Sequence, residues 1–97
     1  MGSGYWVYIL ASKRNGTLYV GMTDNLGRRL WQHREGTAQA FTRRHGVKRL
    51  VHAERFEQLD DARLRERQLK RWRRAWKLEL IEATNPGWDD LSDRLNA

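Results

Sequence analysis

Residues 5–23 read YWVYILASKRNGTLYVGMT, and this stretch decides the fold. Its first seven residues are aromatic, β-branched or aliphatic, which is typical of a strand, and the polar run SKRNG that follows predicts a turn. Residues 17–23 repeat the strand pattern over a similar length. We therefore expect a β-hairpin that reverses through Asn15 and Gly16, residue types that tolerate the positive φ of a tight turn.

A helix and then a loop are predicted directly after the hairpin. Asp24 or Asn25 can cap the helix, because such side chains accept a backbone N–H of the first turn, and apolar residues recur at helical spacing through residues 26–35. Gly36 suits the left-handed conformation that often ends a helix. Residues 36–47 are polar and basic without sustained periodicity, so we expect a loop of the kind that often carries function.

The remaining pattern predicts one more strand and two more helices. Residues 49–56 alternate well enough for a third strand. Asp60 and Asp61 place acidic side chains at the start of a long helix that continues to about residue 83, and residues 88–95 predict a short terminal helix. The order β-β-α-β-α-α indicates an α+β domain, in which a small, mostly antiparallel three-stranded sheet packs against helices.

Length and composition indicate one basic domain in a chain of 97 residues. We expect residues 5–97 to form it and residues 1–4 to be a cloning remnant or a disordered start. The absence of cysteine excludes disulfides and thiolate metal sites, and no apolar run is long enough to span a bilayer, so we expect a cytoplasmic location away from membranes. The formal net charge of +7, with fifteen arginines and four lysines, favours nucleic acid as the partner, and no obligate protein partner is evident.

Alternation along the hairpin brings tyrosine side chains onto one face, because residues two apart in a strand point the same way. We expect Ala11 to pair with Gly16 across the turn. Tyr8 then opposes Tyr19, and both phenols share a face. Gly21 lies beyond Tyr19 without a side chain, so a backbone or a phosphate could approach closely there. A packed aromatic pair next to a bulge would explain the same residues, and a one-residue slip would separate the tyrosines.

The helix after the hairpin adds basic groups beside this face. Arg29 and His33 are four residues apart and share one side of that helix, which the strand delivers next to Gly21. Arg28 lies about 100° around the helix from Arg29, so at most one of the two arginines faces the tyrosines. Arg29 borders the buried stripe that includes Leu30, which makes it the candidate for a half-buried guanidinium and leaves Arg28 as a surface contact.

Glu66 is the single acidic residue among eight lysines and arginines from residue 62 to residue 77. It shares a helical stripe with Ala62, Leu69 and Trp76, on the side expected to face the sheet. A stabilising pair with Lys70, in the favoured i, i+4 order, would explain it. The other explanation is a site for a hard cation, because one carboxylate with waters and substrate phosphate oxygens is a usual way to hold Mg²⁺.

Two segments of the chain resemble the signature of the GIY-YIG endonucleases. Residues 7–9, VYI, resemble the first half of the motif that names this family, and residues 18–21, LYVG, resemble the second half. Residues 25–29, NLGRR, followed by His33, resemble the helix that carries the family's catalytic arginine. Each motif alone is weak, but they occur in the family's order and at workable spacing.

The rest of the chain extends the resemblance. Glu66 stands where the family carries its metal-binding glutamate, and the likeness spans residues 5–91. Residues 85–91, NPGWDDL, resemble the end of the small single-domain bacterial branch called the URI or UPF0213 group. One departure is Met22, which stands where several relatives carry a lysine, so the basic residue that helps the attacking water there is absent or replaced by His33.

The resemblance implies metal-dependent hydrolysis of phosphodiester bonds, with one Mg²⁺ or Mn²⁺ as cofactor and DNA, or alternatively RNA, as substrate. It implies Tyr19 as general base on the attacking water and Tyr8 as the residue that orients that water. It further implies that Arg29 stabilises the pentavalent phosphate and that Glu66 holds the metal on the leaving side. A tyrosine of pKa near 10 is only about one part in a thousand phenolate at pH 7, so such a base needs a cation nearby.

Two other interpretations of the sequence remain. One is a nucleic-acid-binding module of the same fold that is catalytically weak or inactive. The other is a protein-interaction domain that docks a partner through Trp72 and Trp76, although their spacing of four favours the core for both. For nucleic acid we expect low sequence specificity, since no targeting domain is attached, and backbone contacts by Gly21, Arg28, Arg43, Arg44 and Lys70.

Overall fold

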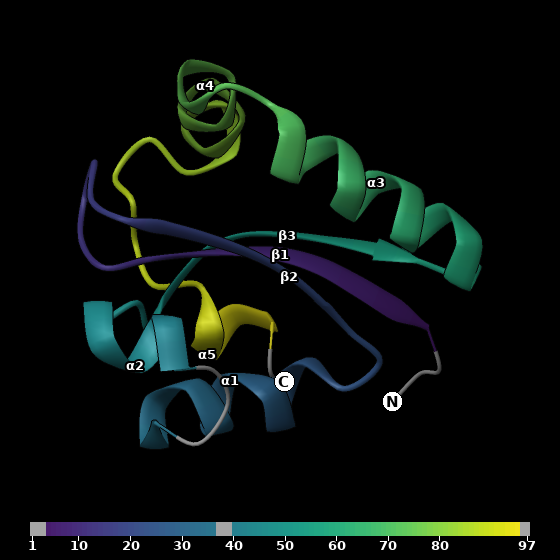
Figure 1. Cartoon of the computed structure of the whole chain (residues 1–97), viewed down its shortest axis with the longest axis horizontal. Coiled ribbons are helices and arrows are strands. Elements are labelled where there is room, and N and C mark those ends of the chain that lie inside the picture. The colour runs from purple at the N-terminus through teal and green to yellow at the C-terminus, as the bar shows by residue number, and fades with distance from the viewer. Residues whose placement is uncertain (1–3, 37–39, 96–97) are drawn as a thin grey trace.

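The computed structural model describes residues 4–36 and 40–95, so residues 1–3, 37–39 and 96–97, which include part of the expected loop, lie outside the described part. Its strands are β1 (Tyr5–Ala11), β2 (Leu18–Thr23) and β3 (Arg49–Phe56), and its helices are α1 (Leu26–Glu35), α2 (Ala40–His45), α3 (Leu59–Arg71), α4 (Arg74–Thr84) and α5 (Ser92–Leu95). The strands form one antiparallel sheet in the order β2-β1-β3, with helices on both faces (Figure 1). The predicted α+β class is therefore confirmed.

The register of the hairpin differs from the predicted register by two residues. Tyr8 pairs with Gly21 rather than with Tyr19. The turn is also longer than the tight reversal that we expect, and Asn15, with φ of 57°, has a positive φ whereas Gly16 does not. A shift of two residues leaves every side chain on its own face, because side chains alternate with a period of two. Both tyrosines therefore still share a face, although the predicted pairing is wrong.

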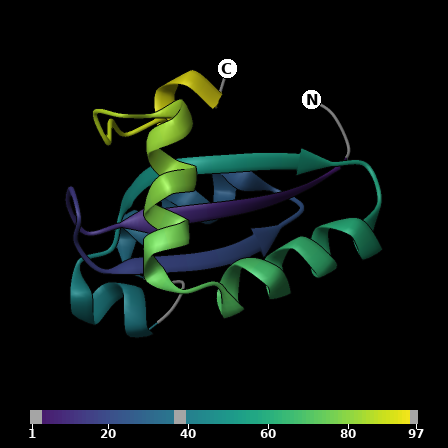
Figure 2. The ribbon, with the colours of Figure 1, turned by 90° about the horizontal axis from the view of Figure 1, so that it is seen from above.

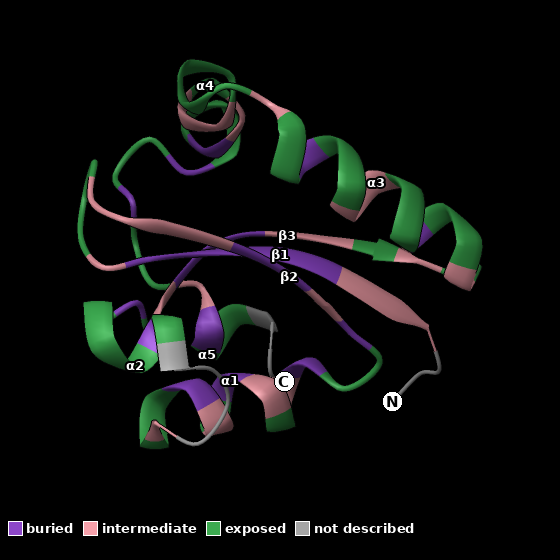
Figure 3. Cartoon of the chain, in the orientation of Figure 1, coloured by how far each residue is buried: buried purple, intermediate pink, exposed green. Residues whose placement is uncertain are grey.

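Alternation along β1 divides the core into two layers, and burial is greatest along this central strand (Figure 3). Val7 and Ile9 face α3 and α4, where Leu69 and Ile81 complete an aliphatic cluster. Tyr8 and Leu10 face the opposite layer, which contains α1, α2 and α5 (Figure 1). The polar atoms that the hairpin buries thus lie in one layer only, the layer of Tyr8.

Seen from above, α4 crosses over the strands and α3 runs beside β2 (Figure 2). In the described residues, α3 contacts all three strands. β2 is an edge strand, so the side of the sheet next to it is open between the two helical layers. No helix in this part of the chain is long and apolar enough to cross a lipid bilayer.

The predicted long helix is interrupted, which is a second correction. Trp72 and Arg73 have extended backbone, with ψ of 142° and 156°, and separate α3 from α4. Trp72 is half-buried against the aliphatic cluster, as expected, but Trp76 is 45% exposed, so its predicted place in the core and on the stripe of Glu66 is wrong. No glycine or proline marks this break. The extended backbone at Trp72 and Arg73 changes the direction of the chain between the two helices.

Two further segments differ from their predictions. The expected loop contains α2, a helix of six residues that is too short to show periodicity but buries Thr42. The expected terminal helix over residues 88–95 is reduced to α5, because Trp88 has a positive φ of 58° and is fully buried. Its indole N–H donates to Glu82 Oε2 over 2.8 Å, which fixes this irregular segment against the end of α4.

Candidate active site

The centre of the site is Tyr8, which is fully buried in the middle of β1. Its phenol oxygen lies 3.2 Å from His33 Nε2, and His33 Nδ1 lies 3.0 Å from Thr42 Oγ1. Three segments that are distant in the sequence, β1, α1 and α2, therefore meet in one buried hydrogen-bond chain. The described residues contain no buried side-chain nitrogen or oxygen atom without a partner.

Burial and the charge of Arg29 lower the pKa of His33 to about 4. The imidazole is therefore neutral at pH 7, with one donor nitrogen and one acceptor nitrogen. Arg29 donates a hydrogen bond to Tyr8, so we assign the phenol proton to a bond toward His33 Nε2 and the imidazole proton to Nδ1, which donates to Thr42. His33 thus cannot supply the positive charge of a lysine, but it holds Tyr8 in place.

Burial also raises the pKa of Tyr8 well above its ordinary value. The nearby Tyr19 and the negative charge of Glu66 raise this pKa further, whereas the charge and hydrogen bond of Arg29 oppose the shift. Tyr8 therefore stays a neutral phenol across the physiological range. These contributions also place Tyr19, Arg29 and Glu66 within electrostatic range of a single phenol.

Tyr19 lies next to this chain and closer to solvent. Its ring centroid is 6.4 Å from that of Tyr8 and 5.4 Å from that of His33, and its side chain is half-buried rather than fully enclosed. On the outer side it meets Phe41, at 6.4 Å between centroids, and Phe41 is 45% exposed. The rings therefore lead from the buried Tyr8 to the surface, with Tyr19 at the boundary.

Gly21 is buried directly opposite Tyr8 in the hairpin. A Cβ atom at this position would lie 2.5 Å from Tyr8 Oη and 3.0 Å from Tyr19 Cε2. The space left by the missing side chain is thus occupied by the Tyr8 phenol. The glycine permits the tyrosines to approach one another, and the expectation that a phosphate uses this clearance does not fit the packing.

α1 presents its two arginines differently. Asn25 caps this helix, because its Oδ1 accepts the Arg28 backbone N–H over 3.1 Å, and Gly36 ends it in the left-handed conformation, as the sequence predicts. Arg29 is half-buried beside Tyr8 and His33, whereas the side chain of Arg28 is exposed. The site therefore contains one guanidinium from this pair, and Arg28 is left on the surface.

Glu66 approaches the site from α3, on the other face of the sheet (Figure 1). Its Oε2 lies 3.1 Å from Lys70 Nζ, so the stabilising pair expected between them is present. The described residues contain no group of three or more histidine, aspartate or glutamate side chains that could hold a metal. The donor set fits a hard cation only as one carboxylate, with water and substrate oxygens as the other ligands.

α2 carries the expected basic contacts. Arg43 and Arg44 are exposed, and Arg43 Nη1 donates to Gly36 O over 3.3 Å, which ties the guanidinium to the end of α1. Thr42 and Phe41 are site residues that the sequence interpretation missed. An apolar Phe41 within a basic segment was the available signal, whereas Thr42 carries none, because its role depends on a partner nine residues away in another helix.

Comparison with known proteins matches residues 4–79 to the GIY-YIG catalytic domain family. The chain is 35% identical over 91 residues to a UPF0213 protein from Clostridium perfringens, an alignment that covers 94% of this chain and 97% of that protein. A UPF0213 protein from Natronomonas pharaonis is 38% identical, with 84% and 94% covered. The solution NMR structure of a UPF0213 protein from Bacillus halodurans superposes with a TM-score of 0.57 at 29% identity, covering 90% of this chain and 92% of that one.

Proposed function

This chain belongs to the GIY-YIG catalytic domain family and to the UPF0213 proteins, and we propose that it is a metal-dependent endonuclease that hydrolyses phosphodiester bonds in DNA. The family is a nuclease family, which makes nucleic acid the expected substrate. One observation carries the finer proposal: the buried phenol of Tyr8, bonded to His33 and Arg29, has Tyr19 at its solvent side and lies within range of the charge of Glu66.

Tyr19 is the proposed general base. Tyr8 is enclosed and kept neutral by burial, so it is poorly suited to take a proton, whereas Tyr19 is the phenol that a substrate can reach. In the reaction the attacking water gives a proton to the Tyr19 phenolate as the oxygen of the water bonds to phosphorus. The bond from phosphorus to the leaving sugar oxygen breaks, and that oxygen takes up a proton from solvent. General base catalysis of this kind contributes about 10² to 10⁴ in rate.

Arg29 and Tyr8 have positioning and charge-stabilising roles in this proposal. A half-buried guanidinium beside Tyr8 can stabilise the negative charge that develops on the phosphate. Tyr8, held by His33 and through it by Thr42, offers its phenol oxygen in a fixed position to orient the attacking water. Preorganisation of this kind avoids reorganisation of the site during the reaction.

Glu66 is the residue that would hold Mg²⁺ or Mn²⁺. When bound, such an ion supplies charge neutralisation at the phosphate and the leaving oxygen. The ion pair with Lys70 engages only Oε2 of Glu66, so Oε1 can serve as the ligand while Lys70 Nζ keeps donors for a phosphate oxygen.

That same ion pair favours a second candidate function. If Lys70 takes the place of a metal ion at Glu66, the protein binds nucleic acid without turnover, as a catalytically weak or inactive module of the fold. The absence of a basic side chain at Met22 and the neutrality of His33 point in the same direction. Both candidates predict binding that weakens with salt, so only a chemical readout separates them.

The test is cleavage of supercoiled plasmid and labelled DNA and RNA strands by the purified protein with Mg²⁺ or Mn²⁺. We expect nicking that stops on chelation, and loss of at least about 10²-fold in rate for Tyr19→Phe and Glu66→Ala with little change in binding. Glu79→Ala, at an exposed glutamate on α4, is the matched control and should cleave as the wild type does. Equal cleavage by Glu66→Ala and the wild type would refute the site, and binding without cleavage would establish the second candidate.

A further inference from the structure

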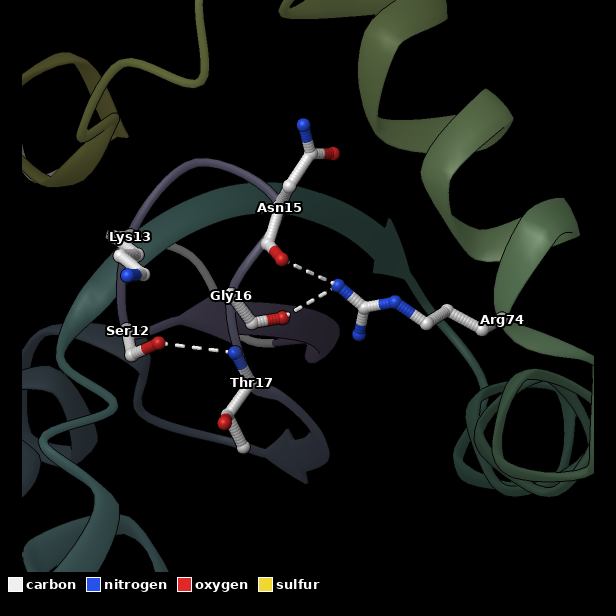
Figure 4. A pocket seen from close by; sticks show the side chains of 6 residues that line it. All are labelled: Ser12, Lys13, Asn15, Gly16, Thr17 and Arg74. Carbon is white, nitrogen blue, oxygen red and sulfur yellow. Dashed lines mark hydrogen bonds between the residues drawn. The ribbon is translucent and has the colours of Figure 1, made fainter.

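Arg74, the first residue of α4, reaches the hairpin turn at the other end of β2 from α1 (Figure 4). Its Nη2 donates to Asn15 O over 2.8 Å and to Gly16 O over 2.7 Å, which joins residues 59 and 58 positions apart. Lys13, Ser12 and Thr17 line the same open pocket, which has a volume of about 440 Å³. The guanidinium is therefore held at a fixed position on the wall of a concave surface.

This pocket concentrates positive charge without a carboxylate to balance it. Among the described residues, no ion pair involves Lys13 or Arg74. Arg14 adds a cation in the same turn, and burial together with the charge of Arg74 lowers the pKa of Lys77, one turn further along α4. Like charges that gather in this way repel one another unless an anion lies between them, so the pocket favours an anionic ligand.

The hydrogen bonds of the turn leave suitable donors for such an anion. Both hydrogens of Arg74 Nη2 are used by the two carbonyl oxygens, while Nε and Nη1 make no hydrogen bond to a described residue. The Thr17 backbone N–H is occupied by Ser12 Oγ at 2.9 Å, so the ligand would be recognised by side chains rather than by the turn amides. Lys13 has an exposed side chain that can approach the same ligand.

The pocket lies at the turn end of the strand that carries Tyr19. Gly16 is three residues before Tyr19, which along an extended chain is about 10 Å. The phosphates of one strand of B-form DNA advance by about 3.4 Å per nucleotide along the helix axis and also turn around it, so this distance spans at most about three nucleotides. The pocket lies at the turn that leads into β2, and Tyr19 lies within β2, an edge strand of the sheet with α3 beside it (Figure 2).

We propose that Arg74 and Lys13 form a second phosphate site that binds the substrate backbone at most about three nucleotides from the cleaved bond. The inference rests on the proposed function in one respect, that the substrate is a nucleic acid bound across Tyr19. The site would hold the register of the strand by charge and not by base identity, in keeping with low sequence specificity. A purely structural clamp is the competing explanation, in which Arg74 only ties the turn to α4 and Lys13 has no role.

Binding titrations with salt distinguish the two explanations without any need for turnover. We expect Lys13→Ala to bind single-stranded or duplex DNA about 3- to 10-fold more weakly, with the slope of log K against log salt smaller by about 0.7 to 0.9. Arg74→Met should reduce the slope by a similar amount. The melting temperature of this variant, compared with that of the wild type, shows how much the hydrogen bonds of Arg74 to the turn contribute to stability. Arg94→Ala, an exposed arginine on α5, is the matched control, for which we expect the wild-type slope.

If Lys13→Ala shows the same affinity and salt slope as Arg94→Ala, the second site is overturned. This outcome counts even if Arg74→Met is unstable. The Lys13 side chain makes no hydrogen bond within the described structure, so its removal should leave the fold intact. Wild-type protein that binds no nucleic acid would instead refute the proposed function itself. The two failures are therefore separate observations in the same experiment.

The position of the site can be measured with oligonucleotides in which every phosphate is a neutral methylphosphonate except the one at the cleavable bond. Restoring the charge of one phosphate at a time should raise the wild-type kcat/KM about 3- to 10-fold at one position, which lies within about three nucleotides on one side. Lys13→Ala should lose that increase and keep the responses at the other positions. Equal responses of both proteins at every position would contradict the inference.

Discussion

Two histidines are buried on opposite faces of the same small sheet, and their partners differ. His33, in the layer of α1 and α2, contacts two hydroxyl groups, those of Tyr8 and Thr42. His52, in the layer of α3 and α4, lies 2.7 Å from a carboxylate oxygen of Glu54, which also accepts two hydrogen bonds from Arg65. Both side chains are nearly inaccessible to solvent.

The difference teaches that burial alone does not identify a reactive group. The Glu54 cluster is closed, since every charge has a partner, and its hydrogen bonds to His52 and Arg65 lower the pKa of Glu54 to about 2 despite burial. The His33 layer instead collects neutral hydroxyl groups next to an arginine that lacks a carboxylate partner among the described ion pairs. An unbalanced cation beside the neutral phenol of Tyr8 is suited to an incoming phosphate, whereas the balanced cluster fastens α3 to β3.

The largest expected contrast comes from one substitution made on each face of β1. Tyr8→Phe removes the phenol oxygen that bonds to His33 and Arg29, so we expect cleavage to slow by about 10² to 10⁴. Tyr5→Phe removes the same atom from the opposite face, where Tyr5 packs against the aliphatic cluster, and should change the rate by less than about twofold. Cleavage rates measured well below both melting temperatures check this, and similar losses in the two variants would show that the faces do not differ.

The second expected contrast is the response to acid. The pKa of His33 is near 6.5 in the unfolded chain and about 4 in the folded protein, so on acidification the unfolded state takes up the proton first. His33 should therefore lower the free energy of unfolding by about 3 kcal/mol as pH falls from 6.5 to 4. Glu54, whose pKa is lowered, should weaken stability in a separate window from about 4.5 down to about 2.

Urea denaturation of the wild type and of His33→Gln at pH 7, 6, 5 and 4 measures the first window. Glutamine can hydrogen-bond but does not titrate, so the variant should start less stable and lose less stability toward pH 4. If the free energy of unfolding falls by the same amount with pH in both proteins, His33 is not held neutral by its surroundings.

The smallest contrast concerns the closed cluster. Arg65→Met removes two hydrogen bonds to Glu54 and a guanidinium that lies 5.1 Å from the centroid of Trp72, so we expect a loss of about 2 kcal/mol in the free energy of unfolding. Cleavage at a temperature where the variant is folded should stay within about twofold of the wild type. A large loss of activity in the folded variant would mean that the layer of α3 and α4 also takes part in catalysis, and would contradict the difference between the two layers.

Much of the fold could be predicted because it depends on local patterns. The bounds of β1, α1 and β3 agree with their predictions, since alternation, the Asn25 cap and the Gly36 terminator act within a few residues. The hairpin register is wrong by two, yet the faces are right, because an even shift does not exchange them. The half-buried state of Arg29 also follows from its place beside the apolar stripe of α1.

Other parts of the molecule could not be predicted, because they depend on contacts between distant segments. α2 is too short to show a period, and the break between α3 and α4 has no glycine or proline. Thr42 gains a role only when α2 packs against His33, and Gly21 is needed because the Tyr8 phenol fills its space. Neither relation leaves a mark in the neighbouring sequence.

By itself, the sequence determined the α+β class, the common face of Tyr8 and Tyr19, the capped helix with Arg29 and the strong positive charge. The tertiary structure alone decided that His33 is neutral, that Glu66 acts on Tyr8 from the opposite layer and that Arg74 meets the hairpin turn. The physical reason is range. Alternation and capping are set by neighbours along the chain, whereas burial, pKa and hydrogen bonds between residues 25 to 59 positions apart exist only once the chain has packed.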